Sequence, residues 1–406
     1  MRILALQSGT SADGIDAALV DIAAADGLEV EILATGTEPW LPAERDLVMR
    51  AVAGEALDPA GWCRLETTVG QAFARAAVRF AGDDARPDLV CAHGQTVFHG
   101  VDGATVWGTL QVGEPAWIAR ATGCPVLFNV RVADVAGGGQ GAPLIAAFDA
   151  RWLAAVAADA GAPVASLNLG GIANLQVVHP HGDVTGFDTG PANALLDAYV
   201  ARETAGAETF DRDGHHAASG RVDEHLLARL RAHRYFLLAP PKTTGRETFT
   251  LATVDDALGS LEARGAAEAA SGAVPSLDDV CATLVELTAS TVADALAAAA
   301  PGAARVIVSG GGARNPVLLA RLRERLGLPV DLSDAWGIPA DAREAVMFAT
   351  LAYLSAARVP LELPGTPAGR AAVAGQWDLS VAPVPTVTPP PTHTSRLRVR
   401  TREDRS

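Results

Sequence analysis

The sequence predicts an α/β fold of two lobes, each a mixed sheet flanked by helices, with the active site in the cleft between them. At 406 residues, the chain exceeds what a single hydrophobic core usually serves. Apolar runs of strand length alternate with helical patterns along it. A strand-turn-strand pattern opens the chain and returns in the second half. These three observations favour two lobes of similar plan.

The first lobe is predicted to span residues 1–130. Two short turns join its first three strands, so we expect antiparallel neighbours. Two helices follow, and "PDLVCAHGQTVFHG" indicates a strand entering a polar turn. "TLQVGEPAWIARATGCPVLFNV" predicts a helix and another strand. The expected strands are 2–6, 15–22 and 28–34, and the expected helices are 42–53 and 62–81.

The second lobe is predicted to span residues 131–354, with the Gly-rich "ADVAGGGQGAPL" crossing between lobes. "PVASLNLGGIANLQVVHPHGDVTGFDTGPANALLDAYV" predicts strand, Gly turn, strand, turn, strand and helix, which repeats the opening plan. "ARVIVSGGGARNPVLLARLRERL" predicts a strand, three glycines and a helix. Residues 355–380 are expected to pack back on the first lobe. The Pro/Thr-rich and then basic tail, 383–406, is expected to be disordered.

Composition excludes several classes of function. The net charge of −15 argues against binding nucleic acid or an anionic membrane by general charge. The four cysteines form no CxxC pair and indicate a reducing compartment. The opening apolar run is too short for a signal peptide, and no stretch of about 20 apolar residues lacks polar interruption. We therefore expect a cytoplasmic protein.

Three glycine-containing turns are candidate phosphate loops. In the first turn, small residues let backbone N–H groups approach phosphate oxygens, and Asp13 can bind a bridging Mg²⁺ through water. An exposed turn is the plain alternative, and Gly-Gly turns such as the second are common. The third turn lies between a strand and a helix, where anions are favoured. The chain lacks GxGxxG and GxxxxGK[ST], which argues against a dinucleotide fold and a P-loop NTPase. The turns are Gly9, Thr10, Ser11, Asp13 and Gly14; then Asn168, Gly170, Gly171 and Asn174; then Gly310, Gly311 and Gly312.

Two carboxylates are catalytic candidates. Asp188, in "GFDTGPAN", lies where a strand meets a helix, a rigid position for a general base. Its alternative role is helix capping or turn chemistry. Glu344 follows Arg343 at the edge of a buried helix. It is either a second active-site carboxylate, or solvated, or paired with Arg343.

Other polar residues are candidates for binding a substrate. Gln95 and Thr96 can contact sugar hydroxyls, whereas zinc at His93 and His99 is disfavoured because no HExxH motif is present. Lys242 is the single lysine of the chain. It lies in "PPKTTGRETF", whose Thr243, Thr244 and Arg246 can join it in pairing with a carboxylate or phosphate. An exposed basic loop is the alternative.

These motifs together resemble a known family. GTSADGID, HGQTVFH, NLGGIAN, GFDTGPAN, KTTGRETF, SGGGARNP and ADAREAVMFA occur in this order. As a set they are similar to the anhydro-N-acetylmuramic acid kinases, over residues 3–377. The two facing strand-turn-strand units resemble the actin, hexokinase and heat-shock-chaperone ATPase superfold. Ala12 stands where the family usually has Met, and Ser309 where Cys is common. Neither change removes a charge or a loop glycine.

The resemblance implies a double reaction in recycling of the bacterial cell wall. Water opens the anhydro bridge of 1,6-anhydro-N-acetylmuramic acid while ATP, with Mg²⁺, phosphorylates the 6-oxygen. It also implies a cytoplasmic homodimer, with Asp188 activating the water and Glu344 helping to hold it. The implied ATP-binding residues are Gly9, Thr10, Ser11, Ala12, Asp13, Gly14, Ile15, Asp16, Asn168, Gly170, Gly171, Gly310, Gly311, Gly312 and Asn315. The implied sugar-binding residues are His93, Gln95, Thr96, Thr189, Gly190, Asn193 and Lys242.

Three alternatives stay open from the sequence. An ordinary sugar kinase of the same superfold would need a free hydroxyl near Asp188. A nucleotide-switched binding protein would carry a long substrate-binding domain after the ATPase, whereas a short tail follows here. A catalytically dead paralogue would lack key carboxylates, but Asp13, Asp188 and Glu344 are all present.

Overall fold

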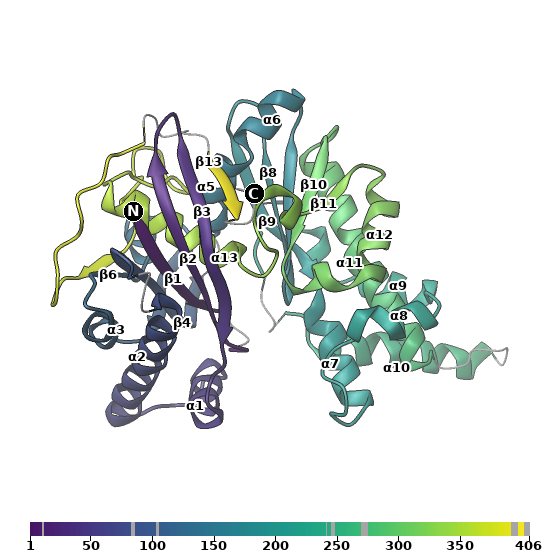
Figure 1. Ribbon diagram of the computed structural model, residues 1–406. Coiled ribbons are helices and arrows are strands. Elements are labelled where there is room, and N and C mark those ends of the chain that lie inside the picture. Colours follow the sequence, from purple (N-terminus) through teal and green to yellow (C-terminus); the bar gives the residue numbers. More distant parts are fainter. Residues whose placement is uncertain are drawn as a thin grey trace. The chain divides into compact units, whose positions relative to one another are not determined.

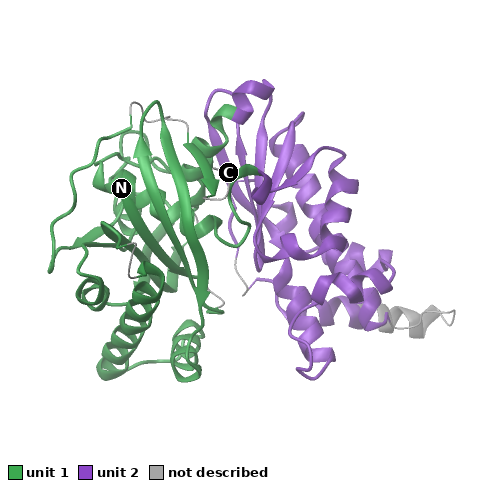
Figure 2. Ribbon diagram, in the orientation of Figure 1, with its two compact units in different colours: residues 1–155, 336–406 green, residues 156–335 purple. Residues whose placement is uncertain are grey.

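The chain divides into two compact units in the computed structural model (Figure 2). Unit 1 comprises Met1–Ala155 and Trp336–Ser406, and unit 2 comprises Val156–Ala335. The structure describes residues 1–9, 12–82, 86–102, 105–240, 242–244, 248–268, 275–390 and 397–401, with side chains of 260–268 not described.

Unit 1 is built on a mixed sheet in the order β12-β6-β4-β1-β2-β3-β13, with β5 paired to β4 (Figure 1). Strands β1, β2 and β3 are antiparallel neighbours, which confirms the prediction for the opening of the chain. Strands β4 and β6 continue the sheet in parallel on the other side of β1. The strands are β1 (Arg2–Ser8), β2 (Ile15–Ala24), β3 (Leu28–Glu38), β4 (Leu89–Asp102), β5 (Thr105–Val112), β6 (Val126–Phe128), β12 (Gln376–Asp378) and β13 (Leu397–Thr401).

Helices cover both faces of this sheet. Leu4 and Leu6 of β1 share one core cluster with Val69 and Phe73 of α2. The alternate residues of β1 are buried as well, because α13 packs against the same strands. Helix α2 begins with Pro at its first position and with the Asp58 carboxylate accepting from the Gly61 N–H, a favourable start signal. The helices are α1 (Pro42–Val52), α2 (Pro59–Ala81), α3 (Pro115–Thr122), α4 (Val132–Ala136), α5 (Ile145–Trp152) and α13 (Arg343–Ala356).

Unit 2 is built on a second mixed sheet in the order β11-β10-β7-β8-β9. Helix α6 (Ala154–Ala160) begins just before the unit, and the short η4 (Ser333–Trp336) ends just after it. The strands are β7 (Val164–Leu169), β8 (Ile172–Val178), β9 (Val184–Pro191), β10 (Arg305–Ser309) and β11 (Val330–Leu332). The helices are α7 (Asn193–Glu203), η1 (Arg212–Gly214), α8 (His215–Ser219), α9 (Glu224–Arg231), η2 (Arg234–Leu237), α10 (Leu251–Glu268), α11 (Leu277–Ala299), η3 (Gly311–Arg314) and α12 (Pro316–Leu326).

Helix α11 is the central helix of unit 2. By length and composition it is the one helix, among the described residues, that could cross a membrane, yet 78% of its most apolar window is buried in the protein. It packs against β8, β9 and the surrounding helices α7, α8, α9 and α12. A capping box between Ser276 and Asp279 fixes its start. We therefore assign α11 to the core.

The two sheets share one plan. In each, the first strand is central and two further strands follow it by antiparallel hairpins, β1-β2-β3 and β7-β8-β9. Two parallel strands then lie on the other side of the first strand, β4-β6 and β10-β11. This duplication confirms the predicted α/β fold with a mixed sheet in each lobe. It also shows that the internal repeat read from the sequence is one of structure.

Three details differ from the sequence predictions. The segment "PDLVCAHGQTVFHG", predicted as a strand entering a polar turn, forms the long strand β4, which bends at Gly94, where φ is +76°, and pairs with β5. The Gly-rich segment predicted to cross between the lobes lies inside unit 1. Its buried Asp134 carboxylate accepts from the Gly141 N–H and from Thr366 Oγ1, and both of these residues also belong to unit 1. The units therefore change at 155/156 and 335/336 instead of 130/131 and 354/355.

The tail also differs from its prediction. Part of segment 383–406, expected to be disordered, forms β13, which pairs in parallel with β3. Leu397 is buried, and Tyr353 of α13 donates a hydrogen bond to the Thr388 carbonyl oxygen at 2.8 Å. The free edge of β3 offers unpaired backbone groups to which another strand can bind. The segment therefore forms a strand despite its polar composition, and its Leu397 side chain is buried.

Candidate active site

Asp188 is the best-defined candidate in unit 2. It lies within the edge strand β9, at a bulge where Asn174 pairs with Asp188 and Ala173 pairs with Gly190. A bulge turns a strand locally and redirects the neighbouring side chains. The carboxylate is buried and accepts from Asn174 Nδ2 at 2.5 Å, Thr243 Oγ1 at 2.9 Å and the Thr244 N–H at 2.8 Å. Burial raises the pKa of Asp188, although these donors act in the opposite direction.

The described residues of the Lys242 loop fix the backbone around Asp188. The Asp188 N–H donates to the Lys242 carbonyl oxygen at 3.0 Å, and the Tyr235 hydroxyl donates to the Asp188 carbonyl oxygen at 2.8 Å. Lys242 Nζ donates to the Tyr235 carbonyl oxygen at 3.3 Å and lies 4.6 Å from the centre of the Tyr235 ring. Burial lowers the pKa of Lys242. The predicted base and the predicted cation thus share one neighbourhood, whereas Arg246 lies outside the described residues.

The second and third glycine turns meet in unit 2. Gly310 has a φ of +84°, and a Cβ there would approach Asn168 Oδ1 to 2.5 Å. A Cβ on Gly312 would lie 2.7 Å from Leu169 Cβ and 3.0 Å from Asn193 Oδ1. Asn193 Nδ2 in turn donates to the Leu169 carbonyl oxygen at 3.0 Å. Only glycine fits this close approach, so the predicted ATP-binding turns are brought together.

Helix α7 anchors the Gly170-Gly171 turn. The backbone N–H groups of Ala192, Asn193 and Ala194 donate to the carbonyl oxygens of this turn at 3.0 to 3.1 Å. Gly311 lies beside Asn193. Asn193, expected on the sugar side, thus lies against the predicted ATP-binding turns.

Three other predicted residues of unit 2 have structural partners. Asn315 caps α12, since its Oδ1 accepts from the Val317 and Leu318 N–H groups. Thr189 Oγ1 donates to the Ala173 carbonyl oxygen at 3.3 Å. Gly190 has a φ of +151°, and a Cβ there would lie 2.7 Å from the Phe236 ring. These contacts explain the three residue types without a ligand, and their binding roles remain predictions.

The first turn belongs to unit 1. Thr10 and Ser11 lie outside the described residues. Ala12 has a φ of +47°, its N–H donates to the Gly9 carbonyl oxygen at 3.0 Å, and its own carbonyl oxygen accepts from Arg45 Nε at 2.9 Å. The Asp13 side chain is 76% exposed and lies 3.7 Å from Arg45 Nη2. A carboxylate in this setting is open to solvent, as a water-mediated Mg²⁺ ligand must be.

The other predicted residues of this turn are built into the sheet. Ile15 is fully buried, and a Cβ on Gly14 would meet Thr37 Cγ2 at 2.3 Å. Asp16 accepts from Gln7 Nε2 at 2.8 Å and Thr37 Oγ1 at 2.7 Å, and burial raises its pKa. These contacts hold the three strands together beneath the turn.

A row of polar atoms lies at the end of β1 and beside the bend of β4. Ser8 pairs with Gln95 in the sheet, and Gln95 Nε2 donates to the Gly9 carbonyl oxygen at 3.2 Å. Within the described part of the chain, Ser8 Oγ, His93 Nδ1 and Gln95 Oε1 are buried and have no hydrogen-bond partner. Thr96 Oγ1 lies 3.5 Å from His93 Nε2. Buried polar atoms without partners need an explanation, and a bound water or ligand is one.

The half-buried Arg131 adjoins this row, and its Nη1 donates to the Gly141 carbonyl oxygen at 2.9 Å. Arg131 lowers the pKa of His93, which burial already holds well below its usual value. Burial lowers the pKa of Arg131 to about 10, while the Glu344 carboxylate acts to raise it. His93 stacks on Phe348, one helical turn after Glu344 in α13, with ring centroids 4.5 Å apart. Arg343, the residue before Glu344, forms a buried ion pair with Asp149.

Comparison with known proteins decides the family. The family described as anhydro-N-acetylmuramic acid kinase matches residues 1–377. The chain belongs to the anhydro-N-acetylmuramic acid kinase family. The kinase of this name from Streptomyces coelicolor is 46% identical over 92% of this chain and 93% of its own length. The one from Rhodococcus erythropolis is 42% identical over 98% and 99%. Both values confirm the resemblance that the motifs indicated.

Among solved structures, the chain is similar to the activator of 2-hydroxyisocaproyl-CoA dehydratase from Clostridium difficile with bound ADPNP. The TM-score is 0.41 at 10% identity, over 86% of this chain and 93% of that one. A likeness of this size has no bearing on function.

Several residues of the candidate site escaped sequence reasoning. Tyr235 carries no motif, and only the fold brings it to the Asp188 backbone. Ser8 and Arg131 flank quoted motifs but look ordinary in sequence.

Proposed function

We propose that this chain uses ATP to convert 1,6-anhydro-N-acetylmuramic acid into N-acetylmuramic acid 6-phosphate, in recycling of the cell wall. Family membership gives the substrate class. The observation that carries the mechanism is the buried Asp188 carboxylate, held by neutral donors, with a raised pKa. A carboxylate in that state is a stronger base than an exposed one.

Asp188 acts on water, because the anhydro sugar has no free 6-hydroxyl. The base takes a proton from a water molecule whose oxygen attacks the anomeric carbon. The bond from that carbon to the 6-oxygen breaks, and the electron pair stays on the 6-oxygen. This oxygen attacks the γ-phosphorus of ATP, and ADP leaves. One water and one ATP are consumed for each sugar, and one proton is released.

The unit 1 polar row is proposed to bind the sugar. Ser8, His93 and Gln95 supply buried polar atoms for which the described residues offer no hydrogen-bond partner. Arg131 is proposed to meet the lactyl carboxylate, since a planar guanidinium is the cation best suited to a planar anion. Glu344 is proposed to help hold the attacking water. The neutral state of His93, favoured by burial and by Arg131, keeps one ring nitrogen able to accept a hydrogen bond.

The glycine turns are proposed to hold the nucleotide. A Cβ at Gly310 or Gly312 would collide with Asn168 or Leu169, so the turn has room only for bare backbone. The Asp13 carboxylate, exposed on the first turn, suits a water-mediated Mg²⁺. Mg²⁺ would neutralise charge on the transferring phosphoryl group. We further propose a cytoplasmic location and a homodimer, both of which follow from the family and the composition.

The test is a coupled ADP-release assay with ATP, Mg²⁺ and 1,6-anhydro-N-acetylmuramic acid. We expect one ADP for each ring-opened, 6-phosphorylated sugar. Asp188→Asn should lower kcat by about 10²–10⁴-fold, while Asp183→Asn, in the exposed turn between β8 and β9, should not. ADP release with intact N-acetylmuramic acid alone would instead indicate an ordinary sugar kinase. No ADP with either sugar would overturn the kinase proposal.

A further inference from the structure

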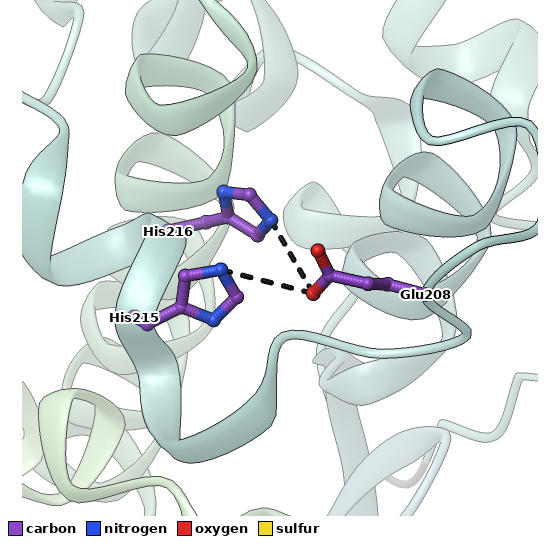
Figure 3. A group of neighbouring side chains, drawn as sticks. All are labelled: Glu208, His215 and His216. Carbon is purple, nitrogen blue, oxygen red and sulfur yellow. Dashed lines mark ion pairs between the residues drawn. The ribbon is translucent and has the colours of Figure 1, made fainter.

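A second cluster of ligand-type side chains lies in unit 2, on elements that the kinase proposal does not use. Glu208, His215 and His216 place one ligand atom each within 4.8 Å of one another (Figure 3). Among the described residues, this is the one group of three or more His, Cys, Asp or Glu side chains with such spacing. Glu208 follows α7, and the two histidines open α8.

The Nε2 atoms of both histidines lie near the same oxygen of Glu208. Glu208 Oε2 lies 3.6 Å from His216 Nε2 and 3.7 Å from His215 Nε2. His216 Nε2 is buried, the His216 side chain is 13% exposed, and the described residues supply no hydrogen-bond partner for this nitrogen. Ligand atoms about 2.0–2.2 Å from a tetrahedral zinc ion stand roughly 3.3–3.6 Å apart. The two separations from Glu208 are close to that spacing, and the ligand atoms of the two histidines lie within 4.8 Å of each other.

The opposite nitrogen of each histidine faces a carboxylate. His216 Nδ1 lies 2.6 Å from Asp278 Oδ1 at the start of α11. His215 Nδ1 lies 3.3 Å from Asp211 Oδ1 and 3.1 Å from the Arg212 carbonyl oxygen. Asp211 is itself fixed, because it accepts from the backbone N–H groups of His216 and Ala217. Metal-bound histidines have such an acceptor on the distal nitrogen, which sets the tautomer and the ring orientation.

The ligand set and its surroundings define the kind of ion. Two imidazoles and one carboxylate suit Zn²⁺, and three protein ligands leave a fourth position for water. Mg²⁺ and Ca²⁺ prefer oxygen ligands throughout. A surface pocket lined by Glu208, Phe210, Arg212 and His215 adjoins the cluster and gives an ion a path of entry.

We propose that Glu208, His215 and His216 bind one Zn²⁺, supported by Asp211 and Asp278. The ion ties the segment after α7 to the start of α8, and through Asp278 to the core helix α11. It is separate from the Mg²⁺ that accompanies ATP, and it is structural with respect to the kinase reaction.

The test uses the full-length protein, stripped with a chelator and titrated with Zn²⁺ by calorimetry. We expect one Zn²⁺ per chain and a higher melting temperature with Zn²⁺ than with Mg²⁺ at the same concentration. The double variant His215→Ala/His216→Ala should weaken binding by about 100-fold or more. The matched control is His179→Ala/His181→Ala, which removes two histidines around the turn between β8 and β9 and should bind Zn²⁺ as the wild type does.

A milder variant guards against misfolding of the double variant. Asp278→Asn keeps all three ligands and should weaken Zn²⁺ binding by about 10- to 100-fold. Substituting Co²⁺ should give the intense visible bands of a four-coordinate ion, and Glu208→Gln should reduce them. Unchanged Zn²⁺ affinity in the double variant and in Asp278→Asn, or a weak six-coordinate Co²⁺ spectrum, would overturn the proposal. Because these readouts need neither ATP nor sugar, they stand apart from the kinase assay.

Discussion

Each of the two sheets has a row of three paired polar residues across its first three strands, and in unit 1 this row is distinct from Ser8, His93 and Gln95. In unit 1 the row is Gln7, Asp16 and Thr37, across β1, β2 and β3. In unit 2 it is Asn168, Asn174 and Asp188, across β7, β8 and β9. Each row contains one carboxylate, and burial raises the pKa of both. The carboxylate lies on the middle strand in unit 1 and on the edge strand in unit 2.

This shift of one strand separates a structural carboxylate from a candidate base. Asp16 has its two oxygens occupied by side chains of the strands on either side. Asp188 has one neighbouring strand within the described sheet, and its second oxygen meets a loop, through Thr243 and Thr244. A loop can adjust around a substrate more readily than a strand can. We therefore propose that similar burial and hydrogen bonding serve packing in the unit 1 row and chemistry in the unit 2 row.

The largest expected effect compares the same substitution in the two rows. Asp188→Asn should lower kcat by about 10²–10⁴-fold, because the amide cannot accept a proton from water. Asp16→Asn should leave kcat within about tenfold and cost about 1–3 kcal/mol of unfolding free energy, because one hydrogen bond in the row loses its acceptor. Steady-state kinetics and urea unfolding of both variants check this. A catalytic loss at Asp16 as large as that at Asp188 would remove the distinction between the rows.

A second prediction separates the sugar-binding contribution of unit 1 from the base in unit 2. Arg131→Met should lower kcat/KM for the anhydro sugar by about 10- to 100-fold, because a hydrogen bond to a charged group contributes about 1.5–3 kcal/mol. The control is a second substrate without the carboxylate. With 1,6-anhydro-N-acetylglucosamine, which lacks the lactyl carboxylate, wild type and variant should be nearly equal. If Arg131→Met harms both sugars alike, the guanidinium supports the fold and does not bind the carboxylate.

The third prediction concerns pH. Asp188 must be ionised to act as a base. The value of kcat should therefore be highest above the raised pKa of Asp188 and should fall as the pH drops through that pKa. Thr243 Oγ1 donates to the carboxylate and lowers that pKa, so Thr243→Val should raise it further. The acid limb of the pH–rate profile should move upward by about one pH unit. Thr185→Val, on the same strand β9, is the matched control and should leave the limb in place. A limb that moves downward would contradict the assignment of Asp188.

What the sequence could and could not predict follows from the range of the interactions involved. The β1–β3 and β7–β9 hairpins are local, so apolar runs and turn residues sufficed to predict them. The Gly310 turn was predicted as well, from three glycines between a strand and a helix. The structure gives the reason for the glycine, since a Cβ there would collide with Asn168 and Leu169. Contacts between distant segments were not predictable. Thr243 reaches Asp188 across 55 positions and Thr366 reaches Asp134 across 232, and no local pattern marks either pair.

The smallest expected effect concerns the strands that unit 1 has beyond the shared plan. Strand β13 pairs with β3 and buries Leu397, whereas β9, the corresponding third strand of unit 2, is the edge of its described sheet. Ending the chain after residue 390 should lower the melting temperature by on the order of 5 °C, because burying one leucine contributes about 1.5–3 kcal/mol. The kcat should stay within about twofold, since β13 lies on the far side of β3 from Gln7 and Asp16. A chain ending after residue 401 keeps β13 and serves as the control. Equal melting temperatures for the two chains would mean that β3 is a stable edge without β13, and the two third strands would then be alike.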